Sequence, residues 1–197
     1  MLNFKKTTFI KSAERVDQCV PDQGCEVAFV GRSNAGKSSA LNTLVGRPIA
    51  RVSKLPGRTQ LINFFEVNDE CRLVDLPGYG FARVTEEMKK RWKKNLTAYF
   101  QTRKSLAGVV LLCDARHPLK TQDLQLIDFV LSLTIPVHLL LTKADKLSKN
   151  EAAKQLKAIQ HTVEKSDLLS IQLFSSLTHL GFETFEKKLA GWFLQRK

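Results

Sequence analysis

Residues 31–38 read Gly-Arg-Ser-Asn-Ala-Gly-Lys-Ser, which places two glycines before a lysine and a hydroxyl residue. Glycine lets a backbone wrap closely around phosphate oxygens, and the N–H groups at a helix start then face the anion. Lys37 can neutralise the outer phosphates, and the Ser38 hydroxyl is a hard oxygen ligand suited to Mg²⁺. Because the run follows the apolar segment 26–30 and matches GxxxxGK[ST], we predict a phosphate-binding loop rather than an ordinary glycine turn.

A second motif, Asp75-Leu76-Pro77-Gly78, ends another apolar segment 39 residues after Gly36. A carboxylate at the end of a strand beside a phosphate loop can hold Mg²⁺ through a water molecule. The Gly78 N–H can reach a γ-phosphate, so its position would report whether that phosphate is present. The spacing DxxG alone often marks only a turn, and the chain order gives the motif its weight.

Thr59 lies in a polar connection of about fifteen residues, 46–60, which contains glycine and proline. Connections of that length in compact domains are usually functional or mobile. We expect Thr59 to close over a nucleotide and give Mg²⁺ a second hydroxyl ligand beside Ser38, with Asp75 acting through water. The alternative is an ordinary polar loop residue. Under the first interpretation the catalytic positions are Lys37, Thr59 and Gly78.

The run Thr142-Lys143-Ala144-Asp145 follows a further apolar segment and predicts a preference for guanine. The Asp145 carboxylate can accept hydrogen bonds from N1–H and the exocyclic amine of guanine. Adenine lacks that donor pair, so ATP would leave buried acceptor oxygens unpaired. The stem of Lys143 can cover the base plane. Phe174-Ser175-Ser176 comes after the last predicted strand, where a backbone contact to guanine O6 is expected.

Apolar segments alternate with helical patterns along the chain, which is typical of an α/β fold with a mostly parallel sheet flanked by helices. We predict six strands, at residues 25–30, 61–67, 71–75, 108–114, 137–142 and 169–174. We predict helices at residues 36–45, 85–102, 121–133, 149–164 and 180–195. Residues 1–24 form a short N-terminal arm that ends near Val20-Pro21, and residues 25–197 form the main domain.

The 197 residues carry 31 basic and 19 acidic side chains, a formal net charge of +12. We expect a polyanionic partner, with RNA favoured over a membrane, although a solvated basic surface is the alternative. Basic residues gather around Trp92 at Lys89, Lys90, Arg91, Lys93 and Lys94, and again at Lys187, Lys188, Arg196 and Lys197.

The chain has no apolar run of 18 residues and no apolar stretch of signal-peptide type near its start. We therefore expect no membrane association and a cytoplasmic protein. The four cysteines, Cys19, Cys25, Cys71 and Cys113, show no CxxC spacing and no neighbouring histidine cluster. We expect free thiols rather than disulfides or zinc ligands.

Taken in order, the motifs resemble the bacterial EngB family (YihA/YsxC) of ribosome-biogenesis GTP-binding proteins, of the TrmE-Era-EngA-EngB type. The features that carry the resemblance are the arm with residues 8–13, GRSNAGKSS, Pro56-Gly-Arg-Thr-Gln60, Asp75-Leu-Pro-Gly-Tyr-Gly80 and Thr142-Lys-Ala-Asp145. The resemblance implies a three-layer Ras-like P-loop GTPase domain that acts in assembly of the large ribosomal subunit, with rRNA and ribosomal proteins as partners. It also implies a link to normal cell division and septation. We expect a monomer, although the sequence does not reveal the oligomeric state.

By motif match the resemblance implies contacts to GTP or GDP from five segments. These residues are Gly31, Arg32, Ser33, Asn34, Ala35, Gly36, Lys37, Ser38, Gly57, Arg58, Thr59, Gln60, Leu61, Asp75, Leu76, Pro77, Gly78, Thr142, Lys143, Ala144, Asp145, Phe174, Ser175 and Ser176.

Tyr79 occupies the position after DxxG where Ras-like enzymes place the glutamine that orients attacking water. We therefore predict slow intrinsic hydrolysis that a partner accelerates. Asn34 is a candidate for binding K⁺ near the phosphates, and a loop-shaping asparagine is the alternative. Three other functions stay open: a binding module gated by GTP, a nucleoside or nucleotide kinase that shares only the phosphate loop, and a septum-associated partner.

Overall fold

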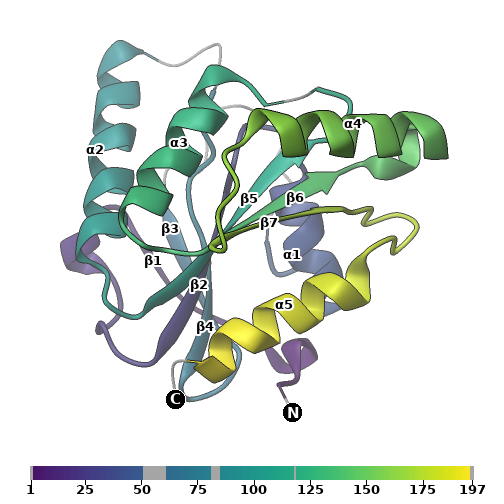
Figure 1. Ribbon diagram of the computed structural model, residues 1–197. Coiled ribbons are helices and arrows are strands. Elements are labelled where there is room, and N and C mark those ends of the chain that lie inside the picture. Colours follow the sequence, from purple (N-terminus) through teal and green to yellow (C-terminus); the bar gives the residue numbers. More distant parts are fainter. Residues whose placement is uncertain (1, 51–60, 81–84, 118, 196–197) are drawn as a thin grey trace.

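The computed structural model describes residues 2–50, 61–80, 85–117 and 119–195, except for the side chains of residues 86 and 89. A single seven-stranded sheet lies between two layers of helices (Figure 1). The predicted three-layer α/β class with a mostly parallel sheet is therefore confirmed.

The strands follow the sheet order β1-β3-β4-β2-β5-β6-β7. Their bounds are β1 Thr8–Ala13, β2 Cys25–Gly31, β3 Ile62–Glu66, β4 Cys71–Asp75, β5 Leu106–Asp114, β6 Val137–Thr142 and β7 Leu169–Leu173. The α-helices are α1 Lys37–Val45, α2 Glu86–Thr102, α3 Thr121–Ser132, α4 Lys149–Thr162 and α5 Phe182–Gln195. Three short 3-10 helices are η1 Phe4–Lys6, η2 Val16–Gln18 and η3 Ala144–Lys146.

The predicted number of six strands is wrong, because the arm contributes β1 as a seventh. This strand pairs antiparallel with β3 at the edge of the sheet, with an irregularity between Phe9 and Lys11. Most of β1 is exposed, and the Phe9 side chain remains 57% exposed while it packs edge-on against Phe65. A half-solvated edge strand has no continuous apolar run, so only its pairing with β3 reveals it.

Alternating residues of the inner strands build two separate cores. Val27 and Phe29 of β2 belong to the cluster that α1 and α5 cover. Ala28 and Val30 belong to the cluster that α2, α3 and α4 cover. Burial on both faces explains why these strands read as unbroken apolar runs.

The register of the sheet brings the carboxyl ends of β4, β2, β5 and β6 together along one side of the sheet. Phe29 of β2 pairs with Asp75 of β4, and Gly31 pairs with Leu112 of β5. Asp114 of β5 in turn pairs with Thr142 of β6. Ligands of open α/β sheets bind at such carboxyl ends, so the predicted motifs share one edge.

A buried ion-pair network occupies the opposite end of the sheet. Glu26 is fully buried, and its carboxylate accepts hydrogen bonds from Arg103 at 2.6 and 2.9 Å and from the Tyr99 hydroxyl at 3.0 Å. Arg103 also donates to the Pro21 carbonyl and lies 3.6 Å from Asp22, which ties the arm to the domain.

The four cysteines are free, as expected, and Cys25, Cys71 and Cys113 are buried. Burial raises the pKa of the Cys19 thiol to about 11. In the part of the chain that the structure describes, no group of three or more His, Cys, Asp or Glu side chains is placed to hold a metal. No helix among the described residues is both long and apolar enough to span a bilayer.

The buried side chain of His138 makes the stability of the fold depend on pH. Its ring is 3% exposed, hydrogen-bonded to Ser170 and Gln172, and stacked near Phe185. Burial, with the nearby Lys188 charge, lowers the pKa of His138 to about 4. The unfolded chain takes up this proton near pH 6.5, so stability is lost as pH falls from about 6.5 to 4, by up to about 1.4 kcal/mol per unit.

We expect His138→Gln to flatten that dependence. Urea unfolding at pH 7 and pH 5 should show a smaller loss of free energy in the variant than in the wild type, because one proton uptake is removed. Equal losses in both proteins would contradict the assignment.

Candidate functional site

The segment between β2 and α1 has the geometry of a phosphate-binding loop. Gly36 caps α1 with φ +88°, and Asn34 also has a left-handed backbone, with φ +64°. A Cβ on Gly31 would lie 2.6 Å from the Leu112 carbonyl oxygen. Glycine is therefore required at residues 31 and 36 for different reasons, close backbone approach and positive φ. The predicted strand–loop–helix context is confirmed.

Lys37 and Asp75 meet at the centre of this edge. The Lys37 ammonium donates a hydrogen bond to Asp75 Oδ1, and both side chains are largely buried, at 14% and 10% exposure. Ser38 follows in the first turn of α1, and no side chain among the described residues hydrogen-bonds its hydroxyl. The Lys37–Asp75 pair thus lies at the start of the helix that carries Ser38, and a cation with oxygen ligands nearby is what a phosphate–Mg²⁺ pair requires.

The turn after β4 lies directly on the phosphate loop. Tyr79 N–H donates to Gly31 O at 3.2 Å, and Ser33 N–H donates to Tyr79 O at 2.8 Å. Leu76 is 1% exposed in the core, so only its backbone can face a nucleotide. The turn that contains Gly78 is therefore hydrogen-bonded, through Tyr79, to the loop that contains residues 31–33.

The Tyr79 side chain faces the interior. It is 5% exposed, and its hydroxyl donates to Asp123 Oδ1 of α3 at 2.5 Å. Burial and the Asp123 charge raise the pKa of Tyr79 far above its ordinary value, so the phenol stays neutral. A phenol fixed in this way cannot orient water at a γ-phosphate.

The end of β6 is tied to the phosphate loop. Thr142 Oγ1 lies 2.6 Å from Ala35 O and 3.1 Å from Cys113 O, and the side chain is buried. Lys143, with φ +58°, donates from Nζ to Asn34 O at 2.7 Å. Residues 142–145, which are predicted to recognise guanine, are therefore hydrogen-bonded directly to the loop of residues 31–38.

Asp145 and Ser175 meet from two separate loops. Ser175 is fully buried and donates from Oγ to Asp145 Oδ1 at 2.7 Å, while Ala144 N–H donates to Phe174 O at 3.1 Å. The Ser175 hydrogen bond lowers the pKa of Asp145, so the carboxylate is ionised at neutral pH. An ionised carboxylate held in one orientation is suited to the two N–H donors of guanine.

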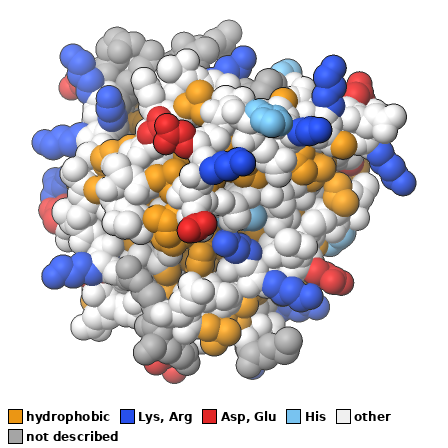
Figure 2. Space-filling view, in the orientation of Figure 1, with side chains coloured by type: hydrophobic (Ala, Val, Ile, Leu, Met, Phe, Trp, Pro, Cys, Tyr) orange, Lys and Arg blue, Asp and Glu red, His pale blue; other side chains and the backbone are white. Residues whose placement is uncertain are grey.

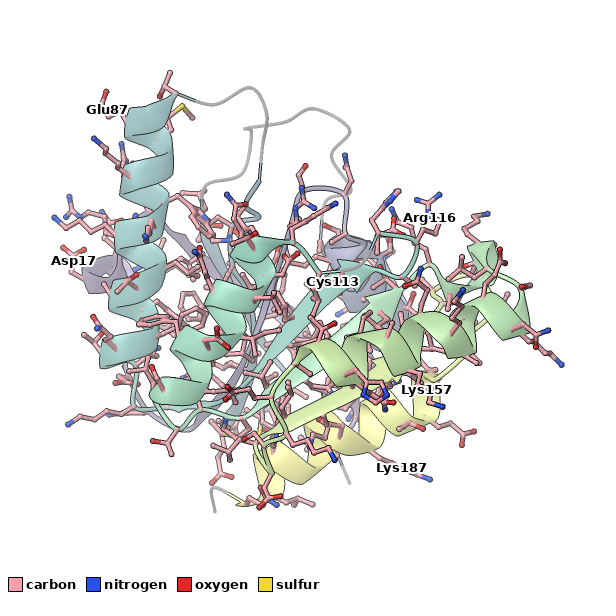
Figure 3. The ribbon with its side chains drawn as sticks, turned by 45° about the horizontal axis from the view of Figure 1, so that its top comes forward. Asp17, Glu87, Cys113, Arg116, Lys157 and Lys187 are labelled. Atoms are coloured by element: carbon pink, nitrogen blue, oxygen red, sulfur yellow. The ribbon has the colours of Figure 1, made fainter. Side chains whose placement is uncertain are left out.

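Asp114 is a site residue that the sequence analysis missed. It lies 2.9 Å from Lys143 Nζ. It accepts two hydrogen bonds from the Arg116 guanidinium, at 2.9 and 2.7 Å, and one from the Arg116 backbone N–H at 3.1 Å. Burial opposes its charge, but the bonds from Arg116 and Lys143 prevail and hold the pKa of Asp114 well below its usual range. Figure 3 shows Arg116 just past the end of β5, near Cys113. The available signal was an acidic residue at the end of a buried strand.

The other predicted site residues either lie outside the described part of the chain or show few contacts. Gly57, Arg58, Thr59 and Gln60 lie outside the described residues, so the Thr59 prediction stays a prediction. Leu61 precedes β3 and is 37% exposed. Arg32 has a buried Nε without a hydrogen-bond partner among the described residues. Ser176 follows Ser175 and is half-buried.

Thr142→Val tests the link between base and phosphate segments. The change keeps the side-chain shape but removes the hydroxyl that serves two buried carbonyls, so we expect the free energy of unfolding to fall by about 1–3 kcal/mol. GDP and GTP should both bind more weakly, and to the same degree, because the loop beneath both is loosened. Titration with both nucleotides checks this, and a change confined to GTP would contradict it.

Comparison with known proteins agrees with this geometry. The family described as 50S ribosome-binding GTPase matches residues 26–143. The probable GTP-binding protein EngB of Francisella philomiragia is 50% identical over 196 residues, covering 98% of this chain and 100% of that protein. The chain belongs to the EngB family. It is therefore a P-loop GTPase with a GTP-binding site.

Solved structures show the same fold for this EngB-family chain. A crystal structure of a probable EngB superposes with a TM-score of 0.71 at 23% identity, covering 87% of this chain and 100% of that one. Era in complex with MgGDPNP and nucleotides 1506–1542 of 16S ribosomal RNA gives a TM-score of 0.66 at 22% identity. That match covers 86% of this chain and 57% of the Era chain.

Proposed function

We propose that this chain is a Mg²⁺-dependent GTP switch that acts on the large ribosomal subunit during its assembly. The observation that carries the proposal is the meeting of Lys37 with Asp75 and of Asp145 with Ser175 at one edge of the sheet. One pair suits triphosphate and metal, and the other suits guanine. Binding of GTP in preference to ATP, measured by calorimetry, is the direct test, and equal uptake of both would reject the proposal.

Each motif then has a role in binding GTP or GDP. Residues 31–38 surround the phosphates, residues 75–78 face the metal and the γ-phosphate, and residues 142–145 with 174–176 hold guanine. Residues 57–61 are proposed to close over the nucleotide. Catalytic contacts come from Lys37, Thr59 and Gly78.

Mg²⁺ is the proposed metal. Its ligands would be the hydroxyls of Ser38 and Thr59, with Asp75 acting through water. Such oxygen donors suit a hard cation, which neutralises charge on the phosphates when bound. The Lys37–Asp75 pair supports this arrangement, because both partners gain a stronger counter-charge once phosphate and metal enter.

Intrinsic hydrolysis is proposed to be slow, because the buried Tyr79 hydroxyl is committed to Asp123. A single-turnover assay without ribosomal particles should therefore give a rate well below one per second, and addition of large-subunit particles should raise it. Seconds-scale hydrolysis by the chain alone would oppose this. A particle that leaves the rate unchanged would favour the second candidate, a binding module in which turnover is incidental.

K⁺ is proposed as an accessory ion near Asn34. The backbone oxygen of Asn34 already accepts from Lys143, so the side-chain oxygen is the group that would meet the ion. Hydrolysis rates in K⁺ and Na⁺ at equal ionic strength test this.

RNA in the large subunit is the proposed docking partner. The description of the matching family names the 50S ribosome, and the net charge of +12 favours a polyanion. Helix α2 exposes Lys90, Arg91, Lys93 and Lys94. Figure 2, in the orientation of Figure 1, shows Lys and Arg side chains spread over the visible face, several of them on the left side, where α2 lies. The basic residues of α2 follow one another within five positions of one helix, which makes α2 the candidate surface.

Sedimentation with ribosomal subunits tests the docking surface. We expect co-sedimentation with the 50S subunit in the imido analogue of GTP, little in GDP, and a steep loss with salt. Lys93→Glu with Lys94→Glu should weaken it strongly. The matched control, Lys154→Glu with Lys157→Glu on the exposed face of α4, should weaken it less. Equal effects would mean that general charge, and not α2, governs docking.

The remaining assignments are proposals that follow from this function. The chain would act in the cytoplasm as a monomer, without membrane contact, and any role in cell division and septation would be indirect. Residues 1–24 would form an arm on the GTPase domain of residues 25–197.

A further inference from the structure

Trp92 of α2 makes a hydrogen bond to the turn that carries Gly78. Its indole Nε1 donates to the Pro77 carbonyl oxygen at 3.0 Å. That carbonyl and the Gly78 N–H belong to the same peptide group, and in a trans peptide the two point in opposite directions. No cis peptide occurs among the described residues. Trp92 therefore holds the carbonyl toward α2 and leaves the Gly78 N–H directed away from it.

The same turn is held from two other sides. The Tyr79 ring packs against the Trp92 ring, with centroids 5.4 Å apart, and its hydroxyl is bonded to Asp123 of α3. The Tyr79 N–H donates to Gly31 O of the phosphate loop. The Pro77–Gly78 peptide is thus bracketed by the phosphate loop, α3 and α2. Among the hydrogen bonds of the described residues, only the one from Trp92 reaches the peptide itself.

The arm fixes α2 on its other side. Asn95 Nδ2 donates to the Glu14 carbonyl at 2.9 Å, and Arg91 forms an ion pair with the Glu14 carboxylate. Figure 3 shows Asp17 of the arm beside the same helix, with Glu87 at its amino end. A small cavity lies between these contacts and Trp92, lined by Ile62, Leu76, Leu96 and Tyr99. The arm therefore holds the helix that carries Trp92 in place.

We infer that Trp92 is a positioning residue for the γ-phosphate, acting through the Pro77–Gly78 peptide. Its hydrogen bond keeps the Gly78 N–H turned toward the phosphate side, so the triphosphate meets a donor already oriented for it. The inference rests on the proposed role of Gly78. GDP has no γ-phosphate and gains nothing from this orientation, whereas the GTP state does. The same contact would transmit the nucleotide state to the basic helix α2.

Trp92→Phe removes the indole donor while keeping an aromatic ring against Tyr79. We expect the affinity for the imido analogue of GTP to fall about 3- to 10-fold, the equivalent of one neutral hydrogen bond, and the affinity for GDP to stay within about twofold. Trp192→Phe is the matched control, because Trp192 belongs to α5 and is buried in the other core. It should leave the ratio of the two affinities unchanged.

The outcomes separate this inference from the proposed function. If the wild type binds neither nucleotide, the proposed function fails. If the wild type binds both but Trp92→Phe weakens both equally, or neither, Trp92 only packs and the inference is overturned. A second measurement needs no change at Trp92. In Trp192→Phe, where Trp92 is the remaining tryptophan, emission should differ between the analogue and GDP, and identical spectra would overturn the inference.

Discussion

Asp145→Asn is expected to weaken GTP and GDP binding by roughly 10²- to 10⁴-fold, and to create affinity for xanthine nucleotides. Under the proposed function the carboxylate oxygens accept two N–H groups of guanine, and each such charged hydrogen bond is worth about 1.5–3 kcal/mol. An asparagine keeps its oxygen for Ser175 and turns its amide donors toward the base. Those donors oppose the guanine N–H groups but match the second carbonyl oxygen of xanthine.

Calorimetric titration of the variant with GDP, XDP and ADP checks the exchange of specificity. The matched control is Asp167→Asn, the same change on an exposed carboxylate outside the site, which should bind GDP as the wild type does. Retention of GDP affinity in Asp145→Asn would reject the guanine assignment. Loss of GDP without any gain of XDP would show that the Ser175 contact, rather than the base contact, is what the variant disrupts.

Glu26→Ala is expected to lower the free energy of unfolding by about 3–5 kcal/mol, because it leaves the Arg103 charge buried without its carboxylate. Arg103 is 8% exposed, and Glu26 and Tyr99 are fully buried, so water cannot replace the lost partner. The Tyr99 hydroxyl loses its acceptor at the same time. Glu26 lies five residues before Gly31 along β2, about 16 Å away, so nucleotide affinity of the folded fraction should not change.

Urea unfolding of Glu26→Ala, of a triple variant and of a surface control, each compared with the wild type, tests whether the unpaired Arg103 charge causes the loss of stability. The triple variant Glu26→Leu, Tyr99→Phe and Arg103→Met replaces the three buried, mutually hydrogen-bonded side chains together, so it should recover more than half of the loss. Arg72, which lies 3.4 Å from Glu26, keeps its hydrogen bond to the Gln23 carbonyl in that variant. The matched surface control is Asp17→Ala, whose ion pair with Arg15 is largely exposed and should matter little. A triple variant that is no more stable than Glu26→Ala would contradict the explanation, because the unpaired Arg103 charge would then not be the cause of the loss.

The sequence alone was sufficient to find the motifs that are proposed to bind GTP, and most of the helices and strands that carry them. The phosphate loop, DxxG and TKAD can be recognised because their chemistry needs particular residue types within a few positions of one another. The inner strands can be recognised because burial on both faces leaves unbroken apolar runs. The order of these local signals along the chain then identified the EngB family before any contact was known.

Tertiary structure alone decided the contacts between residues far apart in the chain. Strand β1 exists because it pairs with β3, and its exposed residues carry no periodic apolar signal. The sequence showed that a tyrosine at position 79 cannot replace the glutamine that orients attacking water. Only the structure shows that its hydroxyl is bonded to Asp123. The same is true of Trp92 on Pro77, because hydrogen-bond direction depends on packing and leaves no trace in local residue spacing.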